Sequence, residues 1–480
     1  MLTALYIFSA LMAAFLLVVL ARAAMFRPVQ KPAAGEEEVD IDPDRTVNDL
    51  REMVRCKTVS YTDESLEDKS QFDSFKELLK KLYPAVNEHA ELSYPSRTGI
   101  LYRIRGKSGS AHAAVFMAHY DVVPADEGSW EKPAFDGVIE DGFLWGRGTL
   151  DTKTTLCGTM EAAEYLLSNG FIPENDIYLA FSGEEEIAGP TASDIAKSLK
   201  AGGVEIDFVI DEGGAVVEGV FPGVKGPCAL VGISEKGIMD AEFRLKSSGG
   251  HASAPPAHTI VGEMAKAICN IEDNPFRMQL TKAVSEMFDT LGRRSTFLYR
   301  IIFANLWCFR WVLDMICRKS GGELNALVRT TAAFTMTKGS LASNVLPNEA
   351  VAVANLRLCG EDTAESALAY LRDKAGNDKI EVSMLHGTDP SPVSLTEGPA
   401  WEKLCRAISQ TWNDAVISPY MMIAASDSRY YSLISDKVYR FSCMALSKEE
   451  RGLIHGNNER IPLQKITETA KFYVRLIKQF

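Results

Sequence analysis

Short apolar runs that end at ionisable side chains mark the first half of the chain. They cover residues 113–118, 177–181 and 204–210, and they stop at His119, at Ser182 before three glutamates, and at Asp211. Runs of this length between polar residues are typical of strands buried on both faces. A helical pattern over 154–168 separates the first two runs. We therefore predict an α/β domain with these polar residues at the carboxyl ends of its strands, where open α/β sheets place their sites.

A different order of elements begins near Lys236. It predicts strands at 240–245, 329–336, 350–358 and 379–385, and helices at 259–271 and 363–375. Four strands with two helices form an α+β unit inserted into the larger domain, which resumes near Pro399. The predicted bounds are 1–24 for an apolar segment, 25–43 for a linker, 44–235 and 396–480 for the larger domain, and 236–395 for the inserted one.

The first twenty residues carry no charged side chain and are long enough to cross a bilayer. We expect either a transmembrane anchor or a signal peptide. The amino side lacks the basic region of a signal peptide, although residues 21–23, Ala-Arg-Ala, resemble a cleavage site. Arg22, Arg27 and Lys31 follow the segment, which favours a single membrane helix with the body on the cytoplasmic face, or secretion if the segment is cleaved. Nine unpatterned cysteines agree with a reducing compartment.

Residues 296–317 are strongly apolar but are interrupted by Arg300, Arg310 and Asp314. This pattern favours an amphipathic helix that lines an acyl-chain pocket or lies on a membrane surface. The alternative is a helix packed into the core of the inserted domain or into a dimer interface.

The composition limits the classes of function. A chain of 480 residues that is 46% hydrophobic and 24% charged is ample for two globular domains. A net charge of −13 without a basic stripe argues against a nucleic-acid partner.

His119 and Asp121 are two apart at the end of a predicted strand, so both side chains point to the same face. A metal-bound histidine usually donates its second ring N–H to a carboxylate or carbonyl, and Asp121 is placed for this role. The alternative is a hydrogen-bonded histidine without a metal. Asp151, in a glycine-rich turn, is free to reach the same metal.

Residues 184–186 are consecutive glutamates directly after an apolar run. One carboxylate can bind a metal while its neighbour handles the proton of an activated water. A solvated acidic turn is the ordinary alternative for such a charge run, but its position after a buried strand argues against that reading.

Together these motifs resemble the co-catalytic zinc hydrolases that include aminoacylase, carboxypeptidase S, glutamate carboxypeptidase and succinyl-diaminopimelate desuccinylase. The resemblance extends from about Asp44 to the C-terminus and is strongest to the carboxypeptidase S and N-fatty-acyl-amino-acid hydrolase subgroup. It implies a zinc-exopeptidase-like catalytic α/β domain, with a central mixed sheet flanked by helices, and an inserted α+β lid and dimerisation domain. The chain departs from the family pattern at Glu184, where aspartate is usual, and at Thr152, where aspartate or methionine is common.

The resemblance also implies residue roles. It makes Glu185 the general base and implies two zinc ions per chain, with cobalt or manganese as alternatives. The implied metal ligands are His119, Asp151, Glu186, Asp211 and His455, with Asp151 bridging both ions. His251 is implied to stabilise the oxyanion, often from a partner subunit, and Asp121 completes the catalytic set. The implied substrate-binding residues are Asn344, Arg357 and Arg429, of which the arginines suit a substrate carboxylate.

We therefore predict a dizinc hydrolase that cleaves N-acyl amino acids or the C-terminal residues of short peptides. Its expected partners are that small substrate, a membrane through the N-terminal segment, and a second copy in a homodimer. Alternatives are a dipeptidase or desuccinylase on the same scaffold, or a non-catalytic, membrane-anchored binding protein. Loss of ligands would have indicated the last, and none is lost from the implied set.

Overall fold

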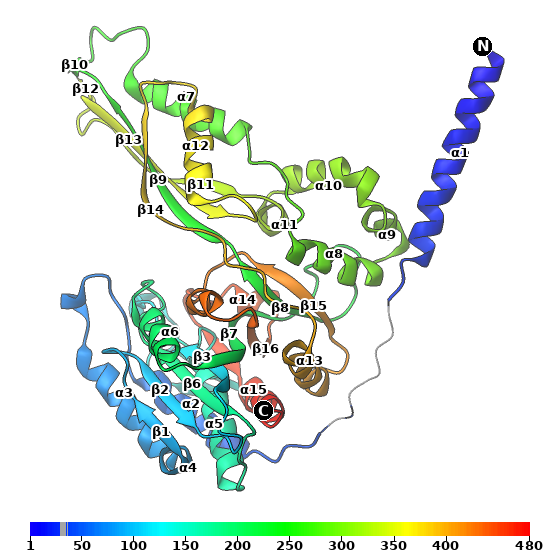
Figure 1. The fold of residues 1–480 in the computed structure, drawn as a ribbon. Helices are drawn as coiled ribbons and strands as arrows, with labels where there is room; N and C mark the ends of the chain where they lie inside the picture. The colour runs from blue at the N-terminus through cyan, green and yellow to red at the C-terminus, as the bar shows by residue number, and fades with distance from the viewer. Residues whose placement is uncertain (29–34, 36) are drawn as a thin grey trace.

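The fold is that of a computed structural model, which describes residues 1–28, 35 and 37–480 (Figure 1). Lys31 and six other residues of the predicted linker lie outside these residues. The body is built on an eight-stranded mixed sheet in the order β1-β2-β6-β3-β7-β16-β8-β15. Its strands are β1 (Ala90–Ser93), β2 (Ile100–Ile104), β3 (His112–His119), β6 (Asp176–Ser182), β7 (Glu205–Val217), β8 (Cys228–Glu235), β15 (Val416–Met422) and β16 (Val438–Ala445).

Helices cover both faces of this sheet. One face packs on α2 (Pro43–Arg55), α3 (Lys69–Leu82), α4 (Pro84–His89), α5 (Lys153–Ser168), α13 (Pro399–Thr411) and α15 (Leu463–Ile477), and the other on α6 (Thr191–Ala201) and the short helix η3 (Asp427–Leu433). In β3, Ala114 and Phe116 join the first core while Val115 and Met117 join the second. Burial on both faces explains why this strand is a continuous apolar run rather than an alternating one.

The second unit, the lid, is a four-stranded sheet in the order β11-β13-β9-β14. Its elements are β9 (Gly237–Lys246), β11 (Thr331–Lys338), β13 (Glu349–Leu358) and β14 (Glu381–Thr388), with α7 (Ile260–Asp273) and α12 (Ala364–Ala375) on one face. Inward residues of β9 and β13 form a separate apolar core with these helices. Figure 1 shows the lid rising from the body, with the small pair β10 (Gly250–His251) and β12 (Val345–Leu346) at its far end.

These two units confirm the predicted fold class, a mixed α/β body with an α+β lid. The strands and helices that we predicted in both are present within a few residues of their expected bounds. The exact domain bounds stay predictions. One strand differs clearly, because β7 continues past Ile210 to Val217, through the acidic and glycine residues where we expected it to end.

Four helices inside the predicted lid range pack elsewhere. These are α8 (Lys282–Arg294), α9 (Phe297–Phe303), α10 (Leu306–Ser320) and α11 (Gly322–Leu327). Met287, Phe288 and Leu313 belong to the core of the body, and none of the four helices contributes to the lid core. The apolar segment 296–317 therefore does not pack into the core of the lid, which contradicts that part of the alternative, whereas its part in a dimer interface stays a prediction.

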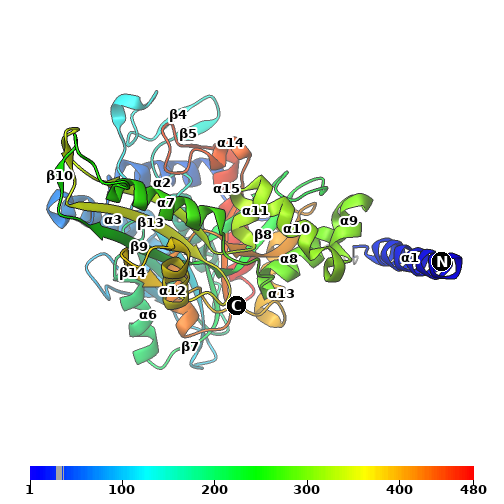
Figure 2. The same ribbon diagram turned by 90° about the horizontal axis from the view of Figure 1, so that it is seen from above.

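The N-terminal helix α1 (Leu2–Met25) extends away from the body and meets α9 at its C-terminal end (Figures 1 and 2). Among the described residues it is the one helix long and apolar enough to cross a membrane. The smaller elements are η1 (Glu64–Leu66), η2 (Glu127–Ser129), α14 (Lys448–Arg451) and a three-stranded sheet of β4 (Val138–Glu140), β5 (Phe143–Trp145) and β17 (Arg460–Pro462).

Candidate dimetal centre

Two clusters of ligand atoms share one carboxylate. His119 Nε2 lies 3.0 Å from Asp151 Oδ1 and 3.4 Å from Glu212 Oε1. On the other side, His455 Nε2 lies 3.0 Å from Asp151 Oδ2 and 3.1 Å from Glu186 Oε2. Each oxygen of Asp151 thus faces a different imidazole, which is the arrangement of a carboxylate that bridges two metal ions.

The spacing and chemistry of these atoms fit zinc. Ligand atoms around a tetrahedral zinc with bonds of about 2.0–2.1 Å lie roughly 3.3 Å apart. The four distances here fall between 3.0 and 3.4 Å. Glu186 Oε1 is buried and has no hydrogen-bond partner among the described residues, so a cation would satisfy it. Imidazole and carboxylate without thiolate suit a hydrolytic rather than a structural site.

The sheet brings these residues together at one edge. His119 is the last residue of β3 and is in register with Ser182, the last residue of the parallel strand β6. The glutamates that follow Ser182 therefore begin beside His119. Glu212 comes from β7 on the other side of β3, so three neighbouring strands deliver side chains to the same point.

Glu212 occupies the position that we predicted for Asp211. Because β7 continues through both residues, their side chains point to opposite faces of the strand. Asp211 is buried, and its Oδ2 accepts a hydrogen bond from the backbone N–H of Ser428 at 3.0 Å. The Glu212 carboxylate is the one that reaches His119. The structure thus replaces Asp211 by Glu212 in the ligand cluster.

Asp121 orients the glutamate loop as well as the histidine. Its carboxylate accepts hydrogen bonds from the N–H groups of Glu185 and Glu186, both at 3.1 Å, and from the Ser60 hydroxyl at 2.7 Å. Nδ1 of His119 lies 3.0 Å from the Asp121 backbone oxygen and 3.4 Å from its Oδ1. The second ring nitrogen of His119 is thus held by Asp121, which leaves Nε2 directed at the cluster.

Glu185 is half-buried beside the cluster, with its carboxylate close to both His119 and Glu212. Burial raises the pKa of Glu185 well above its ordinary value; the charge of His119 opposes this shift, and the carboxylates of Glu212 and Asp427 add to it. A carboxylate whose affinity for protons is raised in this way suits a general base that works near neutral pH.

Glu459 is a functional residue that we did not single out from the sequence. It is fully buried, and its Oε1 accepts hydrogen bonds from the N–H groups of Gly148 at 3.1 Å and Leu150 at 2.7 Å. Its other oxygen pairs with Arg147 at 2.7 Å. Glu459 therefore joins the loop that carries Asp151 to the loop that carries His455. The available signal was its place four residues after His455 in the same motif.

His251 and Asn344 lie together at the far end of the lid (Figure 1). His251 pairs with Val345 across β10 and β12, and the Ala252 N–H donates to the Asn344 backbone oxygen at 3.1 Å. His251 is exposed. Within one chain, neither residue belongs to the ligand cluster.

Arg357 of β13 and Arg429 of η3 act on each other electrostatically. Burial lowers the pKa of Arg357, and the positive charge of Arg429 lowers it further. A pair of arginines in which the charge of one lowers the pKa of the other suits a bound anion.

An apolar cavity of 440 Å³ adjoins the ligand cluster. One wall carries Asp151, Glu185, Glu186, Glu212 and His455, and the remainder is largely apolar, including Phe221, Leu230, Met287, Leu291, Leu324 and Leu327. Helices α8 and α11 thus place apolar side chains beside the centre. A substrate with a long apolar group next to a hydrolysable bond would fit this combination.

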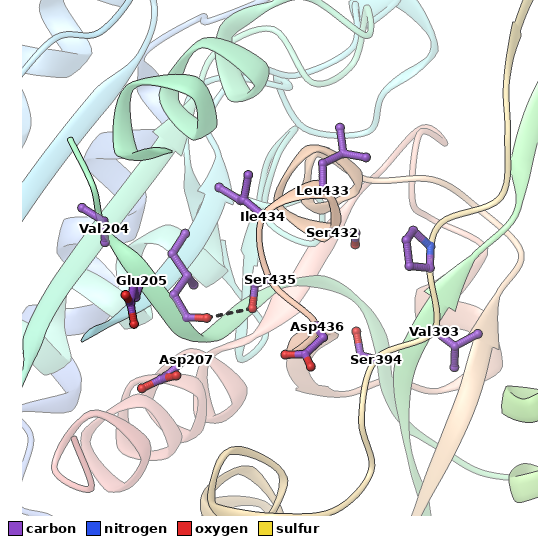
Figure 3. A pocket seen from close by; sticks show the side chains of 12 residues that line it. Val204, Glu205, Asp207, Val393, Ser394, Ser432, Leu433, Ile434, Ser435 and Asp436 are labelled. Atoms are coloured by element: carbon purple, nitrogen blue, oxygen red, sulfur yellow. Dashed lines mark hydrogen bonds between the residues drawn. The ribbon is translucent and has the colours of Figure 1, made fainter. Parts of the chain in front are cut away.

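A second cavity, of 550 Å³, lies at the opposite edge of the sheet, around the first residues of β7 (Figure 3). It is lined by Glu205, Asp207 and Asp436 beside the loop of Ser435, whose hydroxyl donates to the Ile206 backbone oxygen at 2.9 Å. None of the ligand-cluster residues reaches it. This second cavity is larger, but the candidate metal ligands and Glu185 line the first one.

Comparison with known proteins gives consistent relatives. The profile of peptidase family M20/M25/M40 matches residues 115–479. A protein of Xenopus tropicalis described as N-fatty-acyl-amino acid synthase/hydrolase PM20D1 is 34% identical over 487 residues, 98% of this chain and 95% of that protein. A Dictyostelium discoideum protein described as probable carboxypeptidase S-like 2 is 33% identical, over 89% of this chain and 84% of that protein.

Solved structures share the fold. An M20 family metallo-carboxypeptidase from Sulfolobus solfataricus superposes with a TM-score of 0.66 at 18% identity, over 90% of this chain and 98% of that chain. Similar solved structures include one described as a dinuclear metal binding peptidase of the M20 family.

Proposed function

The chain belongs to peptidase family M20/M25/M40, and from that premise we propose that it is a dizinc hydrolase that releases an amino acid from N-acyl amino acids, long-chain ones above all. The family and the enzyme type, a metallopeptidase or amidohydrolase, confirm the predictions from the sequence motifs. The observation that carries the proposal is the bridged ligand cluster in the wall of an apolar cavity.

We assign the metal positions from the observed geometry. One zinc would be held by His119, Asp151 and Glu212, and the other by Asp151, Glu186 and His455. Bound in these positions, the two ions would supply Lewis-acid polarisation of the scissile carbonyl and a water of lowered pKa.

The protein's own residues supply proton transfer and orientation. Glu185 would take the proton of the attacking water and return it to the leaving nitrogen. Asp121 fixes the backbone of Glu185 through one of its two N–H contacts, so it positions the base without touching the substrate.

The acyl chain and the carboxylate of the proposed substrate each have a complementary site on the protein. The acyl chain would occupy the cavity lined by Leu291 and Leu324, since burial of each CH₂ contributes about 0.8 kcal/mol. The free carboxylate of the amino acid would bind Arg357 and Arg429, whose paired positive charges an anion would relieve.

His251 and Asn344 would serve the centre of a second copy. They lie at the lid's far end, away from their own cluster, so an oxyanion role for His251 requires a homodimer in which each lid reaches the partner's site.

The test is release of amino acid from N-acyl amino acids of increasing chain length and from dipeptides, with zinc-loaded protein. We expect turnover of the long-chain substrates, and loss of most of it in Glu185→Gln with metal content retained. Glu174→Gln, an exposed surface carboxylate, is the matched control. Cleavage of dipeptides alone would instead make the protein a peptidase, and full activity in Glu185→Gln would remove Glu185 from the role of base.

A further inference from the structure

The apolar helix α1 is attached to the body by specific contacts with α9 and α10. Arg22 Nη2 donates to the Ala304 backbone oxygen at 3.0 Å, and Asn305 Nδ2 donates to the Val19 backbone oxygen at 3.1 Å. Val19, Ala304 and Asn305 are buried by this contact. The C-terminal part of α1 is thus fixed relative to the segment 297–320.

The outer face of this segment exposes large apolar side chains. Trp307, Trp311 and Met315 form a stripe along α10 at helical spacing and are 62, 67 and 55% exposed, and Leu298 of α9 is 72% exposed. The four other tryptophans of the chain are at most 9% exposed. We name the surface formed by Leu298, Trp307, Trp311 and Met315 the α9–α10 face.

Basic residues are concentrated in the segment that carries this face, in an otherwise acidic protein. Residues 293–319 contain six arginines and lysines and one acidic residue, Asp314, whereas the whole chain carries a net charge of −13. Asp314 is itself paired with Arg318 and Arg329. An apolar stripe flanked by cations is the pattern of a helix that lies in a membrane interface.

The depth of the face along α1 agrees with this pattern. Trp307 stacks edge-on against Phe15, with ring centroids 6.0 Å apart. Phe15 is five residues before Leu20, which at 1.5 Å per residue places Trp307 roughly 7.5 Å inside the apolar stretch of α1. Interfacial helices sit about 5–10 Å into the boundary between headgroups and acyl chains, and tryptophan is enriched there.

From these observations we propose that α1 remains as an anchor and that the α9–α10 face docks into the same bilayer leaflet. The occupant of the face is the headgroup and acyl-chain boundary of the membrane that α1 crosses. The contacts of α1 place the face beside that membrane, and its cations match anionic headgroups.

The docked segment also packs behind the wall of the substrate cavity. Phe303 of α9 packs on Phe221 with ring centroids 4.9 Å apart, and Phe221 lines the cavity together with Leu291 of α8 and Leu324 of α11. We infer that the enzyme takes long-chain acyl substrates from the lipid phase. This second step rests on the proposed function, whereas docking does not.

Docking is tested with the full chain in vesicles of phosphatidylcholine and phosphatidylserine that carry bromine on the upper acyl-chain carbons. Bromine quenches tryptophan within contact range, so we expect quenching of the exposed-tryptophan emission and its loss in Trp307→Phe/Trp311→Phe. Resistance of the protein to alkaline extraction shows that α1 is inserted. Inserted protein without quenching would overturn the proposal, as would removal of α1 during maturation. Cross-linking of two Trp311→Cys chains through this face would assign it to a second copy instead.

Delivery from the lipid phase is tested by Leu298→Glu/Met315→Glu, two exposed side chains outside the cavity. We expect a several-fold loss of activity on long-chain substrate held in vesicles and unchanged activity on a short-chain, water-soluble one. Leu66→Glu, at a residue of the body that is 64% exposed, is the matched control. An equal loss on both substrates, or no loss on either, would overturn lipid-phase delivery. A wild-type protein that is inactive on every substrate but is still quenched by bromolipid would remove the proposed function and leave docking intact.

Discussion

Each carboxylate oxygen of Asp151 faces a different imidazole, Oδ1 towards His119 and Oδ2 towards His455. Removal of this side chain affects both metal positions, whereas removal of His455 affects one. We expect Asp151→Ala to lose most of both zinc ions and His455→Ala to lose about one of the two, measured as metal per chain after dialysis. Equal losses in the two variants would contradict the bridging role.

The metal-free centre should make stability depend on pH. The carboxylates of Asp151 and Glu186 raise the pKa of His455 from 6.5 to about 10, so this contribution is present below about pH 6.5 and is lost as pH rises towards 10. Burial raises the pKa of Glu212 from 4.5 to about 8, so this group lowers stability as pH rises from about 4.5 to about 8. Both groups therefore lower the stability of the metal-free protein as pH rises. We expect the melting temperature of chelator-treated protein to fall between pH 6 and pH 9.

Zinc should reduce that dependence, because it binds the neutral imidazole and the ionised carboxylates. Melting curves with and without zinc, recorded at both pH values, check the sign. A metal-free protein that is more stable at pH 9 than at pH 6 would contradict the assigned charges.

Glu459 acts through the loops that it joins. Outer partners of metal ligands typically contribute 10- to 100-fold to metal affinity or activity. We expect Glu459→Gln to lower activity by roughly that factor, with a parallel loss of zinc affinity measured by competition with a chelator. The control is Glu131→Gln, a change to an exposed glutamate that contacts Asn458 of the same loop. If the two variants behave alike, Glu459 does not position the centre.

At the scale of elements, the strands buried on both faces were predictable. A run such as that of β3 is apolar throughout its interior and is too short for a buried helix. The length of β7 was not predictable. We ended this strand at Asp211, where the apolar run stops, but β7 continues through Gly214, where a side chain would place its Cβ 1.8 Å from the Leu230 backbone oxygen. The glycine is required for the close approach of β8. We took Asp211 as the ligand from the family resemblance, and in the structure the neighbouring Glu212 is the carboxylate that lies beside His119.

The apolar segment shows a second limit of sequence reasoning. Its amphipathic pattern was recognised, but its partner was not, since packing against the body and α1 depends on contacts between residues nearly 300 positions apart. Neither the period of apolar residues in the segment nor its composition identifies the surface against which it packs.

Helix α11 offers a test of the cavity, because Leu324 is only partly buried and tolerates a larger side chain. We expect Leu324→Trp to raise KM for the longest acyl chains and to leave short ones unchanged, since the added ring fills apolar space. Leu66→Trp serves as a control for the effect of an added indole. A uniform change across chain lengths would place the acyl group elsewhere.

At the scale of the whole molecule, the position of His251 predicts complementation between subunits. Separate His251→Ala and Glu185→Gln variants should each be nearly inactive. Random mixing would yield half heterodimers, each with one intact centre, so about a quarter of wild-type activity should return. If His251 serves its own chain, mixing restores nothing. Activity of refolded mixtures, with size-exclusion analysis of the dimer, separates these outcomes.

The chain crosses between body and lid four times rather than twice. It enters the lid after β8, returns to the body core between Phe276 and Met278, re-enters the lid between Val328 and β11, and leaves after β14. A lid joined to the body at two neighbouring points can rotate about more than one axis. Four attachments restrict the lid largely to rotation about a single axis. The two inner crossings bound the segment of α8 to α11, which includes the helices α9 and α10 that hold α1. A rotation of the lid about these attachments would therefore keep a fixed angle to the N-terminal helix, and with that helix in a bilayer, the direction of such a rotation would be set relative to the membrane plane.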